Sequence, residues 1–203
     1  MKIVELILNE EEAASGIEAI SIVESPAIES NFVALNNHKV EFKTLDAEKR
    51  ILMGPALIPN KPIYRNQELN GTPEEFYVYF SKATIEKASQ LYLMRGRQHN
   101  ATLEHDGKIE GLTLVESWIK EDAVNDKSVK YGMNAPVGTW YVSMKVNNEE
   151  VWTDYVKTGK VKGFSIEGYF ADKSTPLSSH KTPEQRLSEV REILSNYLQN
   201  GEQ

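Results

Sequence analysis

The stretch "NATLEHDGKIEGLTLVESWIKED", residues 100–122, indicates a fold built mainly from strands. Apolar and polar residues alternate on both sides of Asp106-Gly107, a dipeptide that favours the tight turn of a β-hairpin. The stretch therefore predicts two strands joined by a short turn.

Similar strand patterns recur on both sides of this hairpin, and helical patterns are few. A helix is expected to begin after Ser81, a good N-cap residue, and to end at Gly96. Gly54-Pro55 predicts a bend inside the apolar run 50–58. About eight to ten strands and two or three helices result, in runs that do not alternate, which favours an antiparallel sheet or barrel over a parallel βαβ fold.

The C-terminal region changes in composition. Residues 171–186, "ADKSTPLSSHKTPEQR", are rich in Ser, Thr, Pro and Lys, as linkers often are. Thr182 and Pro183 then provide an N-cap and a first-turn proline for an amphipathic helix. We therefore expect a β domain over residues 1–172, a linker over 173–183 and a helix over 184–203.

Composition excludes several classes of function. The 203-residue chain has a formal net charge of −7 at pH 7, whereas nucleic-acid binding needs a surplus of Lys and Arg. It has no cysteine, which removes disulfides, thiolate catalysis and Cys-based zinc sites. Glu5 and Glu10–Glu12 interrupt the apolar N-terminus, so we expect no signal peptide, no contact with a membrane and an intracellular, soluble protein.

Ser165, in "VKGFSIEGYF" (161–170), is the first candidate nucleophile. Among the four histidines, His105 is the best candidate base, because it lies at a fixed strand end next to the Asp-Gly turn. His38 lies in a predicted loop and His180 in the predicted linker. His99, at the other end of the same predicted strand, is less well placed. Spacing alone favours an ordinary strand serine, and "GFSIEG" does not match the G-x-S-x-G elbow of α/β-hydrolases.

Five carboxylates could suggest glycoside hydrolysis or a metal site. The simpler interpretation is that they are solvated strand faces, and the H-E-x-x-H pattern is absent. We therefore expect no metal and no cofactor. The five residues are Glu104, Asp106, Glu110, Glu116 and Glu167.

Three blocks together resemble one family: "TLEHDGKIEGLTLVESWIKED", "PVGTWYVSMKV" and "VKGFSIEGYF". They are similar to the phage prohead maturation proteases, specifically the serine proteases of the XkdF type. The resemblance covers roughly residues 75–172, with a weaker match at 19–32. It implies an antiparallel β-barrel ringed by helices, like that of the herpesvirus assemblin proteases. The strand "ISIVESPA" lies before the base in this chain, whereas the corresponding strand of the related proteases follows the nucleophile. The resemblance therefore implies a permuted strand order.

The resemblance implies that Ser165 is the nucleophile and His105 the general base. A third member is not fixed, because Ala19 stands where related proteases have a His or an acid. Glu167 is the first substitute, since it lies two residues after Ser165 on the same strand face. Glu116 is the second, Glu18 would require a register shift, and a Ser-His dyad is the remaining alternative.

The function implied by the resemblance is a serine endopeptidase of phage head maturation. Its substrates would be the scaffold and major capsid proteins and the protease itself, inside the procapsid in the host cytoplasm, with self-association as a further expectation. The alternative is a non-catalytic internal head or scaffold protein that retains the protease fold. Ala19 favours this alternative, and the presence of Ser165 and His105 argues against it.

Overall fold

The computed structural model describes residues 2–9, 12, 14–28, 33–35, 49–69 and 72–173. The predicted helix over 184–203 and the linker beyond Lys173 lie outside these residues, as do His38 and His180. The predicted domain boundaries therefore remain predictions.

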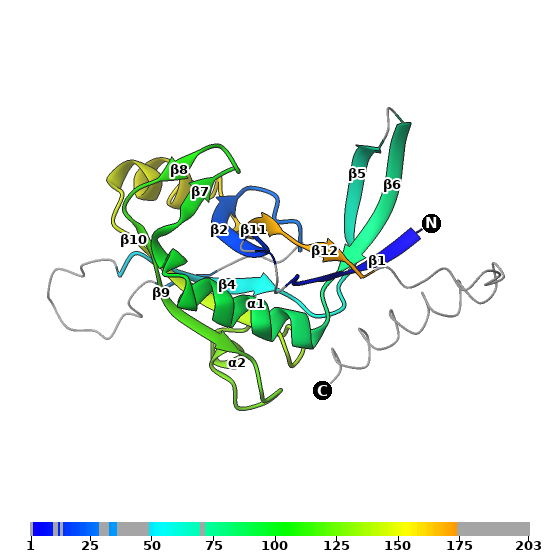
Figure 1. Cartoon of the computed structure of the whole chain (residues 1–203). Coiled ribbons are helices and arrows are strands. Elements are labelled where there is room, and N and C mark those ends of the chain that lie inside the picture. The colour runs from blue at the N-terminus through cyan, green and yellow to red at the C-terminus, as the bar shows by residue number, and fades with distance from the viewer. Residues whose placement is uncertain are drawn as a thin grey trace, which may run out of the picture.

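Twelve strands in the described part of the chain form three four-stranded sheets (Figure 1). In order across each sheet they are β12-β1-β6-β5, β3-β4-β10-β9 and β11-β2-β7-β8. Their bounds are β1 Lys2–Ile7, β2 Gly16–Val23, β3 Val33–Leu35, β4 Ile51–Leu57, β5 Ile63–Leu69, β6 Thr72–Tyr79, β7 Ala101–Leu103, β8 Lys108–Ile109, β9 Leu112–Ile119, β10 Trp140–Val146, β11 Gly163–Tyr169 and β12 Ala171–Asp172.

The third sheet brings distant parts of the chain together. The N-terminal strand β2 lies between β11, with which it pairs antiparallel, and β7, with which it pairs parallel. The parallel pair is possible because the long segment between β2 and β7 provides the crossover connection that parallel strands need. The strand containing Ser165 and the turn after β7 thus lie on either side of β2.

The first sheet holds the two ends of the described chain. β1 pairs parallel with β6 and antiparallel with β12, which follows β11 directly. The β5–β6 hairpin projects away from the body (Figure 1).

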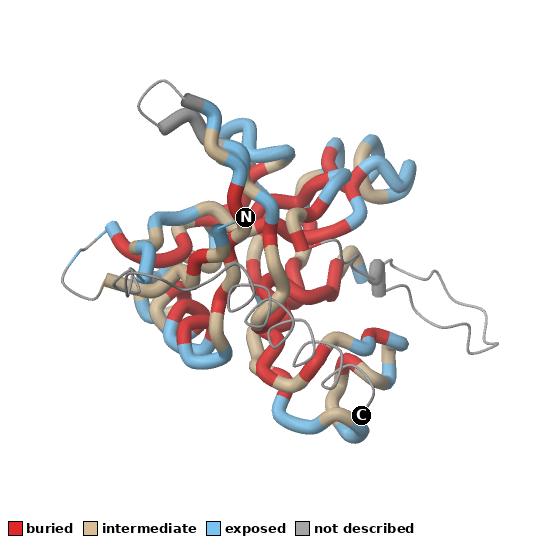
Figure 2. The backbone as a smooth tube through the Cα atoms, turned by 90° about the vertical axis from the view of Figure 1, so that its right-hand side faces the viewer, coloured by how far each residue is buried: buried red, intermediate tan, exposed pale blue. Residues whose placement is uncertain are grey.

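One helix covers the core between the sheets. Helix α1 (Lys82–Met94) begins at Ser81, whose side chain accepts a hydrogen bond from the Thr84 N–H as predicted, and left-handed Gly96 follows its end. Its Tyr92 ring packs edge-to-face on Trp140 of β10, at 5.8 Å between centroids. Buried residues run through the centre of the molecule (Figure 2).

Three short helical segments complete the described chain: the 3-10 helix η1 (Arg97–His99), helix α2 (Lys127–Lys130) and the π-helix η2 (Val151–Val156). None of the helices in the described residues is long and apolar enough to cross a membrane.

The structure confirms a mainly β fold and corrects its details. All three sheets are open in the described part of the chain, so the predicted closed barrel is not confirmed. Two pairs, β1–β6 and β2–β7, are parallel rather than antiparallel, and in each pair the segment between the strands is long enough to provide the crossover connection.

Candidate active site

Strand β11 places two of the predicted residues on one face of the third sheet. Ser165 and Glu167 are two positions apart, so their side chains share a face, while Phe164 and Ile166 point to the other. Phe164 is fully buried in the main core. The face that carries Ser165 and Glu167 is therefore the one turned away from this core.

Strand β2 continues this face. In the antiparallel register Ser21 lies opposite Ser165, and Ala19 lies opposite Glu167. Directly opposed residues have Cβ atoms about 5 Å apart and point to the same side. Ala19 is buried, and its methyl group is the side chain that stands opposite Glu167.

The turn after β7 holds His105 over this face. Glu104 and His105 both have left-handed backbones, with φ of 52° and 60°. Two hydrogen bonds attach them to β2: the Glu104 N–H donates to the Ile22 carbonyl and the His105 N–H to the Ser21 hydroxyl, both at 3.1 Å. A third comes from the residue that follows β2, since the Glu24 N–H donates to the Glu104 carboxylate at 2.6 Å. Two consecutive left-handed residues other than glycine are costly, so these bonds are needed to hold the turn.

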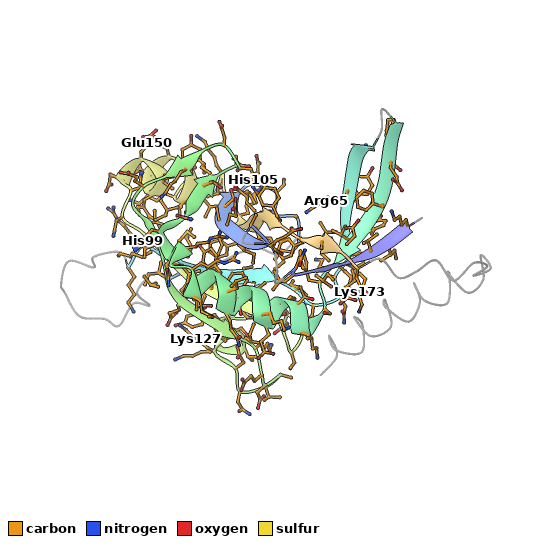
Figure 3. All side chains as sticks on the ribbon, viewed as in Figure 1. Arg65, His99, His105, Lys127, Glu150 and Lys173 are labelled. Atoms are coloured by element: carbon orange, nitrogen blue, oxygen red, sulfur yellow. The ribbon has the colours of Figure 1, made fainter. Side chains whose placement is uncertain are left out.

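The ring of His105 meets Glu167. The two side chains come from elements 62 residues apart, and His105 Nδ1 lies 3.0 Å from Glu167 Oε1. The Thr102 hydroxyl of β7 donates a hydrogen bond to the same carboxylate oxygen. The His105 side chain is 44% exposed and that of Glu167 32%, so the pair lies at the surface. Figure 3 labels His105 at the edge of the molecule.

Ser165 stands directly opposite the serine that holds the turn of His105. It is 7% exposed, and its hydroxyl forms no hydrogen bond with another of the described residues. Ser21 is the register partner of Ser165 and accepts the hydrogen bond of the His105 N–H, so the turn that carries His105 is attached to the strand beside Ser165. With Nδ1 on Glu167, Nε2 is the nitrogen that remains for Ser165.

Glu116, the second predicted third member, lies elsewhere. It belongs to β9 in the second sheet, where its carboxylate accepts hydrogen bonds from Lys127 and Ser143, both at 2.5 Å. Partial burial would raise the pKa of Glu116, but the hydrogen bonds from Lys127 and Ser143 and the charge of Lys127 together lower it. Glu116 is therefore engaged in an ion pair outside the group around His105.

Glu18 and His99 are not part of the group either. Glu18 alternates with Ala19 along β2, so it points to the opposite face, where Arg97 lies 3.8 Å from its carboxylate. His99 Nδ1 lies 3.0 Å from the Thr113 hydroxyl of β9. Within the described residues, no three His, Asp or Glu side chains are placed to hold a metal ion.

Two residues of this face were not singled out from the sequence. Ser21 and Thr102 are both buried, and they are register partners in the β2–β7 pair. A strand serine or threonine has no local signature, so only the pairing of the strands reveals them. The single available signal is the spacing of Thr102 in "TLEH", three residues before His105.

The comparisons with known proteins give one match. A family model described as "Putative phage serine protease XkdF" matches residues 40–174. No curated protein and no solved structure matches the chain significantly. The matched range contains Thr102, His105, Ser165 and Glu167, whereas β2 with Ser21 precedes it.

Proposed function

This chain belongs to the family of phage serine proteases of the XkdF type, and we propose that it is a serine endopeptidase. In this proposal Ser165 is the nucleophile, His105 is the general base and Glu167 orients the base.

The observation that carries the proposal is the 3.0 Å contact between His105 Nδ1 and Glu167 Oε1. Serine hydrolases need a base that is held in one tautomer by an acceptor on its far nitrogen. Glu167 supplies that acceptor from the same strand face as Ser165, and both residues stand on a strand fixed by seven register pairs to β2. Catalytic hydrogen bonds are often long or poorly aligned in a free enzyme. The lack of a hydrogen bond from the Ser165 hydroxyl to another described residue is therefore compatible with this role.

The proposed reaction is acyl transfer. His105 Nε2 takes the proton of Ser165 Oγ as the oxygen attacks a peptide carbonyl carbon, and backbone N–H groups stabilise the oxyanion. The imidazolium then gives this proton to the leaving amine, and the C–N bond breaks. Water, deprotonated by His105, attacks the acyl carbon. The ester C–O bond then breaks, the imidazolium returns its proton to Ser165 Oγ, and the new carboxyl group is released. The Glu167 carboxylate stabilises the imidazolium.

The substrates that we propose are the scaffold and major capsid proteins of the phage head and the protease itself. The family label supports a phage protease, and the remaining steps of this assignment are our inference. The place of action would be the procapsid in the host cytoplasm. Composition also makes residues 171–183 a candidate site of self-cleavage. Because residues 171–172 form β12, the candidate is the Ser- and Pro-rich part after Lys173, whose composition is typical of exposed segments.

A fluorophosphonate probe tests the chemistry without knowledge of the substrate. We expect covalent labelling of the wild-type chain, loss of labelling in Ser165→Ala, and a strong decrease in His105→Ala. Ser89→Ala, which removes a buried serine from α1, is the matched control and should be labelled like wild type. Labelling that persists in Ser165→Ala would assign the nucleophile to another residue.

Co-expression with the cognate scaffold and capsid proteins tests the biology. Wild type should cleave a partner or itself over time, and Ser165→Ala should leave both intact. If the wild-type chain leaves all proteins intact and is not labelled, the non-catalytic head-protein alternative replaces the protease assignment.

A further inference from the structure

Thr102 occupies a central position on the face that carries the candidate active site. It lies on β7 opposite Ser21, is 7% exposed, and donates its hydroxyl hydrogen to Glu167 Oε1. This is the oxygen that also meets His105 Nδ1. One carboxylate oxygen is thus shared between a buried hydroxyl and the ring of the proposed base.

The carboxylate needs such an anchor. Glutamate has three rotatable side-chain bonds, and Glu167 is 32% exposed on β11, the end strand of its sheet, next to a register shift between Glu167 and Gly168. A solvated glutamate in this position would sample many rotamers. Thr102 is β-branched and buried, so its side-chain rotamer is restricted and its hydroxyl is a fixed donor.

We propose that Thr102 is a positioning residue of the protease: its hydroxyl fixes the Glu167 carboxylate in the place where it orients the His105 imidazole. The inference rests on the proposed function for its effect on catalysis. The inference also predicts that the hydrogen bond between Glu167 and His105 depends on the Thr102 hydroxyl. This dependence can be measured whether or not the chain is a protease.

The alternative is that Thr102 has only a structural role: its buried hydroxyl donates to Glu167 because this carboxylate is the nearest acceptor, and the position of Glu167 does not depend on it. In that case removal of the hydroxyl would change stability and leave the His105–Glu167 contact as it is. The two explanations therefore differ in what happens at the imidazole, three residues away from Thr102 along the chain.

Two substitutions separate these explanations. Thr102→Val keeps the shape and removes the donor, whereas Thr102→Ser keeps the donor and removes a methyl group. The matched control is Thr139→Val, the same change at a buried threonine outside the site, whose hydroxyl has no partner among the described residues. Thermal unfolding identifies variants that fail to fold before any kinetic comparison is made.

The first measurement is the second-order rate of fluorophosphonate labelling at Ser165. We expect Thr102→Val to lower it by roughly tenfold or more, because a misplaced base loses much of its effect. Thr102→Ser and Thr139→Val should stay within about twofold of wild type. With a peptide substrate, the same loss should appear in kcat with little change in KM.

The second measurement is the NMR signal of the Nδ1 proton of His105 on Glu167, identified by its loss in Glu167→Gln. We expect this signal to broaden or disappear in Thr102→Val and to persist in Thr102→Ser and Thr139→Val. A folded Thr102→Val that keeps the signal and the wild-type labelling rate would overturn the inference. If wild type is not labelled at all, the proposed function fails, and the NMR result still decides whether Thr102 positions the pair.

Discussion

The backbone N–H of His105 donates a 3.1 Å hydrogen bond to the hydroxyl of Ser21, a residue 84 positions earlier in the chain. Ser21 in turn donates to the Thr102 carbonyl at 3.4 Å and lies opposite Ser165 in the β2–β11 pair. A single buried serine thus connects the strand of the proposed nucleophile with the turn that carries the proposed base.

Ser21→Ala should therefore weaken both stability and reactivity. It leaves the His105 N–H without its acceptor at a left-handed position, which we expect to cost roughly 1–2 kcal/mol in unfolding free energy and to reduce fluorophosphonate labelling. Urea unfolding and the labelling rate check the two effects. Ser25→Ala is the control, because Ser25 is exposed just after β2 and should be neutral in both. A wild-type labelling rate in Ser21→Ala would show that the turn around His105 keeps its position without the hydrogen bond to Ser21.

Gly168 should tolerate no side chain. A Cβ atom there would collide with the Gly16 carbonyl oxygen and would lie 2.8 Å from the Ile17 Cα atom of β2. Gly168→Ala should destabilise the protein by about 2 kcal/mol or more and displace Glu167 at the adjacent register shift. Chemical unfolding measures the loss.

Gly132→Ala is the comparison for Gly168→Ala. Gly132 has a φ of 74°, and no atom lies within 4 Å of the place that a Cβ would take, so alanine there should cost only the backbone penalty of about 1 kcal/mol. An equal loss of unfolding free energy in Gly168→Ala and Gly132→Ala would mean that the close approach of β2 at Gly168 adds nothing to the cost of the alanine side chain.

Thr139→Val should stabilise the protein. The Thr139 hydroxyl is buried and has no hydrogen-bond partner in the described part of the chain, a situation that costs free energy. The isosteric methyl group removes this cost, so we expect an increase of about 1 kcal/mol in unfolding free energy and a higher Tm. A decrease would indicate a bound water or another partner at this position.

Glu5 predicts a pH dependence of stability. Burial would raise the pKa of Glu5, but hydrogen bonds from Lys173 and Ser81 and the charge of Lys173 together lower it. The Lys173 ammonium lies 2.9 Å from the carboxylate and joins the end of β12 to β1. Because the folded-state pKa is the lower one, the stabilisation is present above the unfolded value of about 4.3 and is lost as pH falls through the folded value.

Glu5→Gln should therefore be less stable than wild type at pH 7, by up to about 1 kcal/mol, and the difference should shrink as the solution is acidified below about pH 4. Unfolding curves at several pH values provide the measurement. Glu74→Gln is the control, since Glu74 makes only an exposed 3.9 Å contact with Lys2. A difference that grows on acidification would contradict the sign of the shift.

Local pattern alone did not group the site residues. The two-residue period of strands placed Ser165 and Glu167 on one face, whereas His105 was joined to them only by the resemblance to a family. The structure joins His105 to Glu167, the first of the three proposed third members. The catalytic roles themselves remain predictions.

What the sequence did not reveal depends on contacts between distant segments. Residues 63–69, "IYRNQEL", are too polar to predict a strand, and the pairing with β6 makes them one. At Gly54-Pro55, where the sequence predicts a bend inside an apolar run, β4 continues to Leu57. Its pairing with β10 shifts register at this place: Pro55 lies opposite Tyr141 and Leu57 opposite Trp140, which leaves Ala56 without a partner in the pairing.

The position of β2 has a consequence for the folding of the nascent chain. Within the described chain β2 is synthesised well before β11, with which it must pair. Such a high separation of contacting residues makes this pairing slow and late. The proposed base and the proposed nucleophile therefore stay apart until β11 has left the ribosome, so the proposed active site cannot form before then.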